Sequence, residues 1–266
     1  MKKTTLIGMI FLIALLSNGQ TIRLDLKATQ KSLAKTQENL YFSKTEVTNA
    51  QYSVLLKNLK ENNRTKELQI AQIDTTNWTT DLKYGEPLTV HYHSHPAYGV
   101  YPVVNVSYEG ATLFCQWMTD QYNANEKRKF KKVTFRLPTE QEWITAAKGG
   151  NPEAIYPWEG NQLMNEKGVP LCNFVRAAED TMGVANIHND GAQLTAPSKS
   201  YLPNGFGLYN MSGNVAEMIA NKDQTMGGCW LDNAEAMQIG SEGKFSNFYK
   251  PAPTIGFRYV MEVIEE

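Results

Sequence analysis

Three cysteines are the residues of this sequence whose type could support redox chemistry or bind a soft metal. The thiolate would be the reactive form, because it is both the nucleophile and the metal ligand. Three cysteines are too few for a disulfide scaffold and leave at least one thiol unpaired within the chain. One alternative is a disulfide between Cys172 and Cys229. The other is that these two and Cys115 are small buried apolar residues, and we expect this burial for Cys115 and Cys229.

A second candidate for metal chemistry is the group of His91, His93 and His95. On a strand, this alternation would place the three imidazoles on one face, an arrangement that could hold zinc or copper. No fourth ligand lies nearby in the sequence, so we expect a polar loop or strand face instead. A metal at this position would indicate a metal-dependent hydrolase or a transporter accessory protein.

The elements that position such residues belong to a globular chain. A length of 266 residues allows one large domain or two small ones, and 42% apolar residues exclude a disordered or collagen-like protein. The 26 basic residues nearly balance the 27 acidic residues. This balance argues against a nucleic-acid-binding protein, because such a protein gains its affinity by neutralising phosphates.

The N-terminus has the pattern of a secretory signal peptide over residues 1–19. A basic start precedes an apolar run at residues 6–16, which is too short to span a bilayer, and an uncleaved anchor is the alternative. We expect cleavage near Gly19 and Gln20 and export to the periplasm, the cell surface or the medium. Residues 20–39 are polar and are predicted to form a linker or loosely docked arm. No later stretch could span a membrane, so an integral membrane protein is not expected.

Helix signals are concentrated before residue 150. Two capping boxes and one single cap are present: Thr48 with Gln51, Thr139 with Glu142, and Ser107. The chain that follows is rich in Gly, Asn and Pro, which predicts short strands and many turns. Helices early and irregular β-structure late predict a single α+β domain over residues 40–266.

Several short segments together carry a resemblance to a known family. They are EVTNAQY at 46–52, YPVVNVS at 101–107, FRLPTEQEW at 135–143, YPW at 156–158, PNGFGLYNMSGNVAE at 203–217, GG at 227–228 and GFR at 256–258. Their order and spacing resemble the sulfatase-modifying factor domain, the domain of formylglycine-generating enzyme. The resemblance implies a C-type-lectin-like α+β fold with few helices, short strands and much irregular structure.

The catalytic positions of the family are where this sequence departs from the resemblance. In formylglycine-generating enzyme, two cysteines that follow the Gly-Gly segment bind copper and oxidise a sulfatase cysteine, and soft thiolates suit Cu(I). Alignment on the Gly-Gly segment places Asp232 and Met237 at those positions. We therefore expect no copper and no catalytic residue. Cys229 is the weak candidate for a rearranged oxidase site.

The resemblance also implies two structural calcium sites. The first would use Asn173, the Phe174 carbonyl, Asp190 and the Ala192 carbonyl; the second would use Asn210, Glu217 and the carbonyls of Gly213 and Val215. Calcium prefers six to eight hard oxygens of these kinds. The alternative is that the polar side chains only form hydrogen bonds in turns.

These observations favour a secreted, calcium-stabilised, non-catalytic domain that acts as a binding or structural module. The resemblance suggests a secretion or gliding assembly at the cell surface as one setting. We expect the contact surface in the loop region of residues 230–253, which begins at Trp230 and ends at Pro253, and no nucleic-acid partner. The alternative is a formylglycine-generating-type oxidase of sulfatase cysteines with a rearranged active site.

Overall fold

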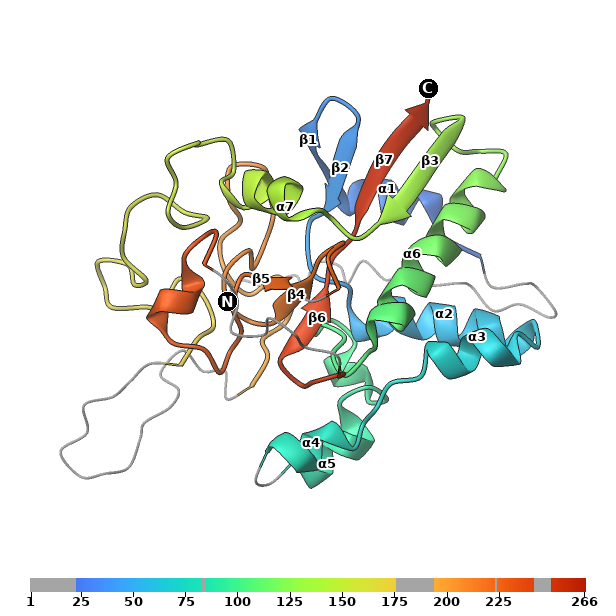
Figure 1. Cartoon of the computed structure of the whole chain (residues 1–266), viewed down its shortest axis with the longest axis horizontal. Helices are drawn as coiled ribbons and strands as arrows, with labels where there is room; N and C mark the ends of the chain where they lie inside the picture. The colour runs from blue at the N-terminus through green and yellow to red at the C-terminus, as the bar shows by residue number, and fades with distance from the viewer. Residues whose placement is uncertain (1–22, 83–84, 176–193, 223, 242–249) are drawn as a thin grey trace, which may run out of the picture.

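A computed structural model describes residues 23–82, 85–175, 194–222, 224–241 and 250–266 (Figure 1). Its helices are α1 (Leu26–Lys31), α2 (Asn49–Glu61), α3 (Thr65–Ile70), α4 (Asn77–Asp81), α5 (Glu86–His91), α6 (Tyr108–Asn123) and α7 (Glu140–Ala147), with short 3-10 helices η1 (Pro96–Tyr98) and η2 (Ala234–Met237). Its strands are β1 (Leu33–Gln37), β2 (Leu40–Ser43), β3 (Lys132–Arg136), β4 (Ala216–Met218), β5 (Thr225–Met226), β6 (Ile255–Phe257) and β7 (Val260–Glu265).

A four-stranded antiparallel sheet joins the two ends of the described chain. Its strand order is β1-β2-β7-β3, so the last strand lies between β2 and β3, which come much earlier in the sequence (Figure 1). The linker or arm expected over residues 20–39 is instead, from residue 26 onward, α1 followed by β1. Leu33 and Ala34 are buried there, and burial of such apolar side chains favours a paired strand over a loose arm.

The predicted caps are confirmed. Thr48 Oγ1 accepts from the N–H of Gln51 at 3.3 Å, and Gln51 Oε1 accepts from the N–H of Thr48 at 2.8 Å. The second capping box precedes α7, and the single serine cap precedes α6. Long α6 packs against β3 beside the sheet (Figure 1). Each of these helices turns its apolar stripe toward the core, as the spacing of apolar residues predicts.

The region between α2 and α6 contains helices for which no cap or apolar periodicity was identified. α3, α4, α5 and η1 lie there, within residues 61–100. Each of these helices is short and mostly exposed, and α3 and α5 bury no residue. Their polar sequence suits this exposure. Short polar helices carry little periodicity, so the sequence gives a weak signal for them.

The later part of the chain has the short strands and irregular structure that were expected. β4 pairs with β5 antiparallel and with β6 parallel, giving a second sheet of order β5-β4-β6. Asn210, Gly213 and Asn214 have positive φ in the turn before β4. Glycine and asparagine tolerate this conformation better than other residues. In the part of the chain that the structure describes, no helix is long and apolar enough to cross a membrane.

Candidate functional site

The two positions that correspond to the family's copper-binding cysteines lie in the 228–237 segment, the stretch from Gly228 to the end of η2. Asp232 is buried, and its Oδ2 accepts a hydrogen bond from the N–H of Cys229 at 2.9 Å. The N–H of Asp232 donates in return to the Cys229 carbonyl at 2.9 Å. The carboxylate therefore closes a tight turn, which is a structural role.

Met237 fills the other position with an apolar side chain. It is fully buried in a cluster with Tyr156, Cys172 and Phe174. It also lies against Gly228, where an added Cβ would approach the Met237 methyl carbon to 2.5 Å. The Met237 thioether therefore packs directly against Gly228, and only a glycine at position 228 leaves space for it.

All three cysteines are buried, which confirms the burial expected for Cys115 and Cys229. No Cys172–Cys229 disulfide is formed. Burial raises the pKa of the Cys115 thiol to about 12. Burial also raises the pKa of the Cys229 thiol, and the Asp232 carboxylate next to it adds to this effect. Protonated thiols are poor nucleophiles and poor metal ligands, so Cys229 is not activated in this arrangement.

A buried polar cluster is in contact with this segment. It is formed by Glu46, Asn173, Asn210, Asn214, Glu217, Arg258 and Trp143. The N–H of Trp230 donates to the Asn214 carbonyl at 3.0 Å, which joins the cluster to the 228–237 segment. Glu46 is fully buried and accepts from Asn214 Nδ2 at 2.8 Å and from Asn210 Nδ2 at 3.0 Å. Burial raises the pKa of the Glu46 carboxyl to about 7, although Arg258 acts in the opposite direction.

Glu217 forms an ion pair with Arg258 in the same cluster. The guanidinium Nε and Nη2 each donate to a different Glu217 oxygen at 2.6 Å, and Trp143 Nε1 donates to Oε2 at 2.7 Å. Both charged side chains are inaccessible to solvent or nearly so, at 0% and 1% exposure. Burial opposes the charge of Arg258, but the Glu217 carboxylate outweighs it and raises the arginine pKa.

The structure places the side chains of three predicted calcium ligands, Asn173, Asn210 and Glu217, in this cluster. Asn173 Oδ1 and Asn210 Oδ1 are buried, and neither has a hydrogen-bond partner in the described part of the chain. An unsatisfied buried amide oxygen is costly unless something else binds it. Each predicted site thus contains one free hard oxygen of the kind that calcium prefers, and the residues present fit the ion.

The remaining predicted ligands are less informative. Gly213 lies against the Asn173 backbone, because an added Cβ would approach the Asn173 carbonyl oxygen to 2.2 Å. Phe174 and Val215, expected to contribute only carbonyls, bury their side chains in apolar clusters. Asp190 and Ala192 lie outside the described residues. The structure therefore brings together Asn173, Asn210, Gly213 and Glu217, and the two calcium sites stay predictions.

Sequence reasoning missed four residues of this cluster: Glu46, Asn214, Arg258 and Trp143. Glu46 begins the EVTNAQY segment, but no role was inferred for it. The signal available was weak: a single acidic residue beside Val47, which is fully buried. Its partners lie 164 and 168 residues away, so only the folded chain reveals the contact.

The histidine group does not form a common face. His91 ends α5, and His95 Nδ1 accepts from the N–H of Ala97 at the start of η1. His93 turns inward to bond Asn49 Oδ1 at 2.9 Å. Of the two expected alternatives, the strand face is wrong because this stretch is helix and turn, where alternate residues do not share a face; the turn at residues 92–94 agrees with the polar loop. Among the described residues, no group of three or more His, Cys, Asp or Glu side chains could hold a metal ion.

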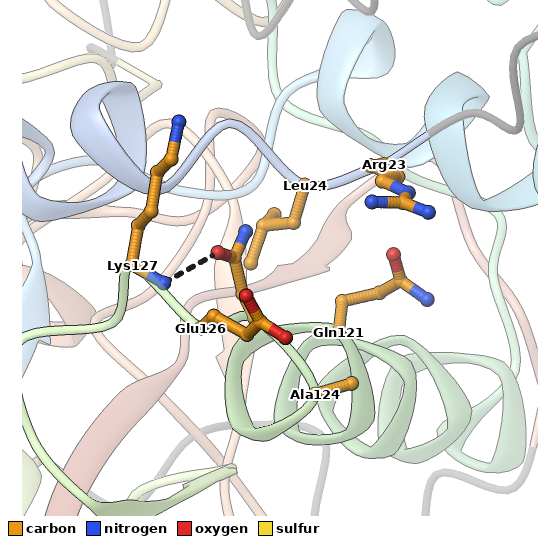
Figure 2. A pocket seen from close by; sticks show the side chains of 7 residues that line it. Arg23, Leu24, Gln121, Ala124, Glu126 and Lys127 are labelled. Carbon is orange, nitrogen blue, oxygen red and sulfur yellow. Dashed lines mark hydrogen bonds between the residues drawn. The ribbon is translucent and has the colours of Figure 1, made fainter.

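An open cleft of about 590 Å³ lies elsewhere, between the N-terminal segment and the end of α6 (Figure 2). Arg23, Leu24, Gln121 and Glu126 are among its lining residues. The N–H of Lys127 donates to a neighbouring asparagine at its rim, drawn as the dashed line in Figure 2. None of the residues of the buried polar cluster or of the 228–237 segment lines this cleft.

Residues 18–263 match the family model described as the sulfatase-modifying factor enzyme 1-like domain. The formylglycine-generating enzyme of Thermomonospora curvata is 39% identical over 121 residues, which are 46% of this chain and 33% of that protein. The inactive C-alpha-formylglycine-generating enzyme 2 of Bos taurus is 31% identical over 144 residues, 51% of this chain and 40% of that protein. The chain thus matches less than half the length of each of these relatives.

Solved structures show the same fold. Treponema denticola variable protein 1 has a TM-score of 0.54 at 18% identity, over 87% of this chain and 91% of that chain. PvdO from Pseudomonas aeruginosa has a TM-score of 0.52 at 19% identity, over 84% of this chain and 80% of that chain. These likenesses confirm the expected α+β architecture with few helices and short strands, and at this identity they concern the fold alone.

Proposed function

The chain belongs to the sulfatase-modifying factor family, and from this premise we propose that it is a non-catalytic member, an exported binding or structural module stabilised by calcium. One observation carries the proposal. The two positions at which formylglycine-generating enzyme has its copper-binding cysteines hold Asp232 and Met237, and both side chains are buried in structural roles. A carboxylate and a thioether do not reproduce a pair of thiolates toward Cu(I).

A relative that is named as inactive supports this proposal. The bovine relative, at 31% identity, is named an inactive formylglycine-generating enzyme, so the family includes members described as inactive. Cys229, which exchanges hydrogen bonds with Asp232, is buried, and burial raises the pKa of its thiol. A rearranged oxidase built on Cys229 would need a thiolate in contact with its substrate.

The test is an assay of oxygen consumption and peptide mass with a sulfatase-type cysteine peptide and added copper. We expect no turnover by the wild-type protein. Turnover that is lost in Cys229→Ser but kept in the matched Cys115→Ser variant would overturn the proposal in favour of the oxidase. The Asp232→Cys, Met237→Cys double variant asks whether the scaffold regains copper binding when the pair is restored.

Calcium is proposed because each site offers an unpartnered buried amide oxygen, from Asn173 and Asn210. The Glu217 carboxylate has about four lone-pair positions, and the three bonds from Arg258 and Trp143 leave one free. Bound calcium would supply positive charge and tie together loops that have little regular structure, and binding to the native state alone stabilises that state.

We expect the melting temperature of chelator-treated protein to rise by several degrees on addition of calcium. Saturation at a hundredfold excess over the dissociation constant corresponds to about 2.7 kcal/mol of stabilisation. Magnesium at the same concentration is the control ion, because it demands a smaller octahedral site. Equal melting temperatures with and without calcium would remove calcium from the proposal.

Export and the contact surface complete the proposal. The basic start and apolar run of residues 1–19 support export. The tests are cell fractionation and the finding of Gln20 at the N-terminus of the exported protein.

For contact, the loop region of residues 230–253 offers Leu231, which is 44% exposed, while residues 242–249 lie outside the described residues. Crosslinking in the native host tests this surface by comparing the wild-type protein with Leu231→Asp, in which the contact should be lost. A crosslinking pattern unchanged by Leu231→Asp would place the contact elsewhere.

A further inference from the structure

We propose that a basic surface around the loop between α6 and β3, the cationic face, docks the protein on a membrane that contains anionic phospholipid. Six side chains from β1, this loop and the start of β3 form the cationic face: Lys35, Lys127, Arg128, Lys129, Lys131 and Lys132. None of them belongs to the buried polar cluster or to the loop region of residues 230–253. The inference is therefore independent of calcium binding and of the catalytic positions.

The loop between α6 and β3 is held in one shape by its own contacts. Arg128 Nε donates to the Lys131 carbonyl at 2.9 Å, and Nη1 donates to the Asn125 carbonyl at 3.1 Å. Phe130 is only 9% exposed and packs in the main core, whereas Lys129 and Lys131 on either side of it are exposed. The loop thus presents its ammonium groups from a fixed backbone, and such preorganisation lowers the entropy lost on binding.

Tertiary packing adds Lys35 of β1 to the cationic face. Lys35 pairs with Tyr41 across β1 and β2, and the Tyr41 ring packs against Phe130 with the ring centroids 5.8 Å apart. The Lys35 ammonium lies 6.0 Å from the centroid of the Tyr41 ring, and the Lys129 ammonium lies 4.7 Å from that of the Phe130 ring. The two contacting rings therefore bring together cations that are far apart in the sequence.

The charges of the cationic face have no counter-ion in the part of the chain that the structure describes. None of its six side chains forms an ion pair there, whereas four other basic side chains pair with glutamates. The whole chain has a formal net charge of −1, so the positive excess is local. A surface of this kind is attracted to an anionic membrane, and each basic residue near the membrane strengthens the attraction.

The side chains of the cationic face suit the phosphates of a lipid surface better than a nucleic acid. Five of the six are lysines, and an ammonium group is a compact charge on a flexible stem that can follow mobile phosphates. Single-stranded nucleic acids stack their bases on exposed aromatic rings. Here Phe130 is buried and Tyr41 packs against it, so the face presents ammonium groups and no free ring.

The open cleft beside Lys127 suits a single lipid headgroup. Its volume is about 590 Å³, and Figure 2 shows Lys127 and Arg23 on opposite sides of it. Gln121 and Glu126 also line the cleft, and the oxygens of both side chains accept hydrogen bonds from hydroxyl groups. A headgroup that combines a phosphate with hydroxyl groups, as in phosphatidylglycerol, would meet the cations and these acceptors together.

The test is co-sedimentation of the full chain with vesicles of phosphatidylcholine, with and without phosphatidylglycerol. We expect tighter binding to the anionic vesicles, weakened by added salt because exposed charges are screened. The double variant Lys129→Gln, Lys131→Gln should bind the anionic vesicles about 30-fold more weakly, since each basic residue contributes about fivefold. The matched control, Lys167→Gln with Lys199→Gln, removes the same charge from exposed lysines of other loops and should bind as wild type does.

Heparin, a soluble polyanion, separates a membrane from an acidic polysaccharide as the partner. Binding to heparin without binding to the anionic vesicles would overturn the inference and place a polysaccharide on the cationic face. It is also overturned if wild type binds neutral and anionic vesicles equally, if the Lys129 and Lys131 variant binds as wild type does, or if the control variant loses as much. None of these outcomes changes the proposals on calcium or on the absence of catalysis.

Discussion

The buried polar cluster and the 228–237 segment are neighbours joined by a backbone hydrogen bond, yet they use burial in opposite ways. The polar cluster holds an ion pair, a second carboxylate and two amide oxygens without described partners. In the 228–237 segment, Asp232 is satisfied by a turn and Met237 is surrounded by apolar groups. The comparison teaches that one part of this scaffold can bury charged and unsatisfied polar groups while the neighbouring positions 232 and 237 are ordinary core.

The largest expected effect is in the polar cluster. Arg258→Met should lower the free energy of unfolding by about 3–5 kcal/mol, because it leaves the Glu217 carboxylate buried without its partner. Urea denaturation measures the change. Arg64→Met is the control at an exposed pair with Glu67, where about 0–1 kcal/mol is expected. Equal losses in the two variants would mean that the cluster is no different from the surface.

Met237→Ala tests whether the second region is packed as core. We expect a loss of about 2–5 kcal/mol, because the truncation removes buried contacts and leaves a cavity beside Gly228 and Cys172. Leu202→Ala, at a side chain that is 80% exposed, should stay within about 0.5 kcal/mol of wild type. If the stability of Met237→Ala matched that of the control, the position would be open enough for a ligand, and the comparison would fail.

Asp232→Ala should cost less, about 1–3 kcal/mol, because it leaves the N–H of Cys229 buried without its acceptor. Asp232→Asn keeps an acceptor oxygen at the same place and should recover most of the loss. Thermal and chemical unfolding of both variants give the measurement. Equal destabilisation by the two changes would show that the charge of Asp232, and not the hydrogen bond, is what matters there.

The smallest expected effect concerns the thiols. In the folded protein, all three cysteines should resist a disulfide reagent at mildly alkaline pH, because all three are buried and burial also raises the pKa of the Cys115 and Cys229 thiols. In denaturant all three should react, and in Met237→Ala the label on Cys172 should appear faster than in wild type. Rapid labelling of Cys229 in the folded wild-type protein would contradict the account of this segment.

Local signals in the sequence were enough for the main helices. Thr48 with Gln51 and Thr139 with Glu142 form their capping boxes because each pair is only three residues apart. The strand β1 was missed because it depends on a partner strand, β2, and on the burial of Leu33 against the core. The strand alternative for the three histidines was wrong for a related reason: alternation has meaning only if the backbone is extended.

The sequence by itself determined the family, the α+β class and the absence of a cysteine pair at the catalytic positions, since each depends on residue identity and spacing. Only the tertiary structure decided what replaced that pair and which acid completes the polar cluster. Glu46 meets Asn210 across 164 residues, and no periodicity or cap encodes such a contact. Burial is the physical reason for the state of both regions. It raises the pKa of the Cys229 thiol in the 228–237 segment, and it leaves two amide oxygens of the polar cluster inaccessible to solvent.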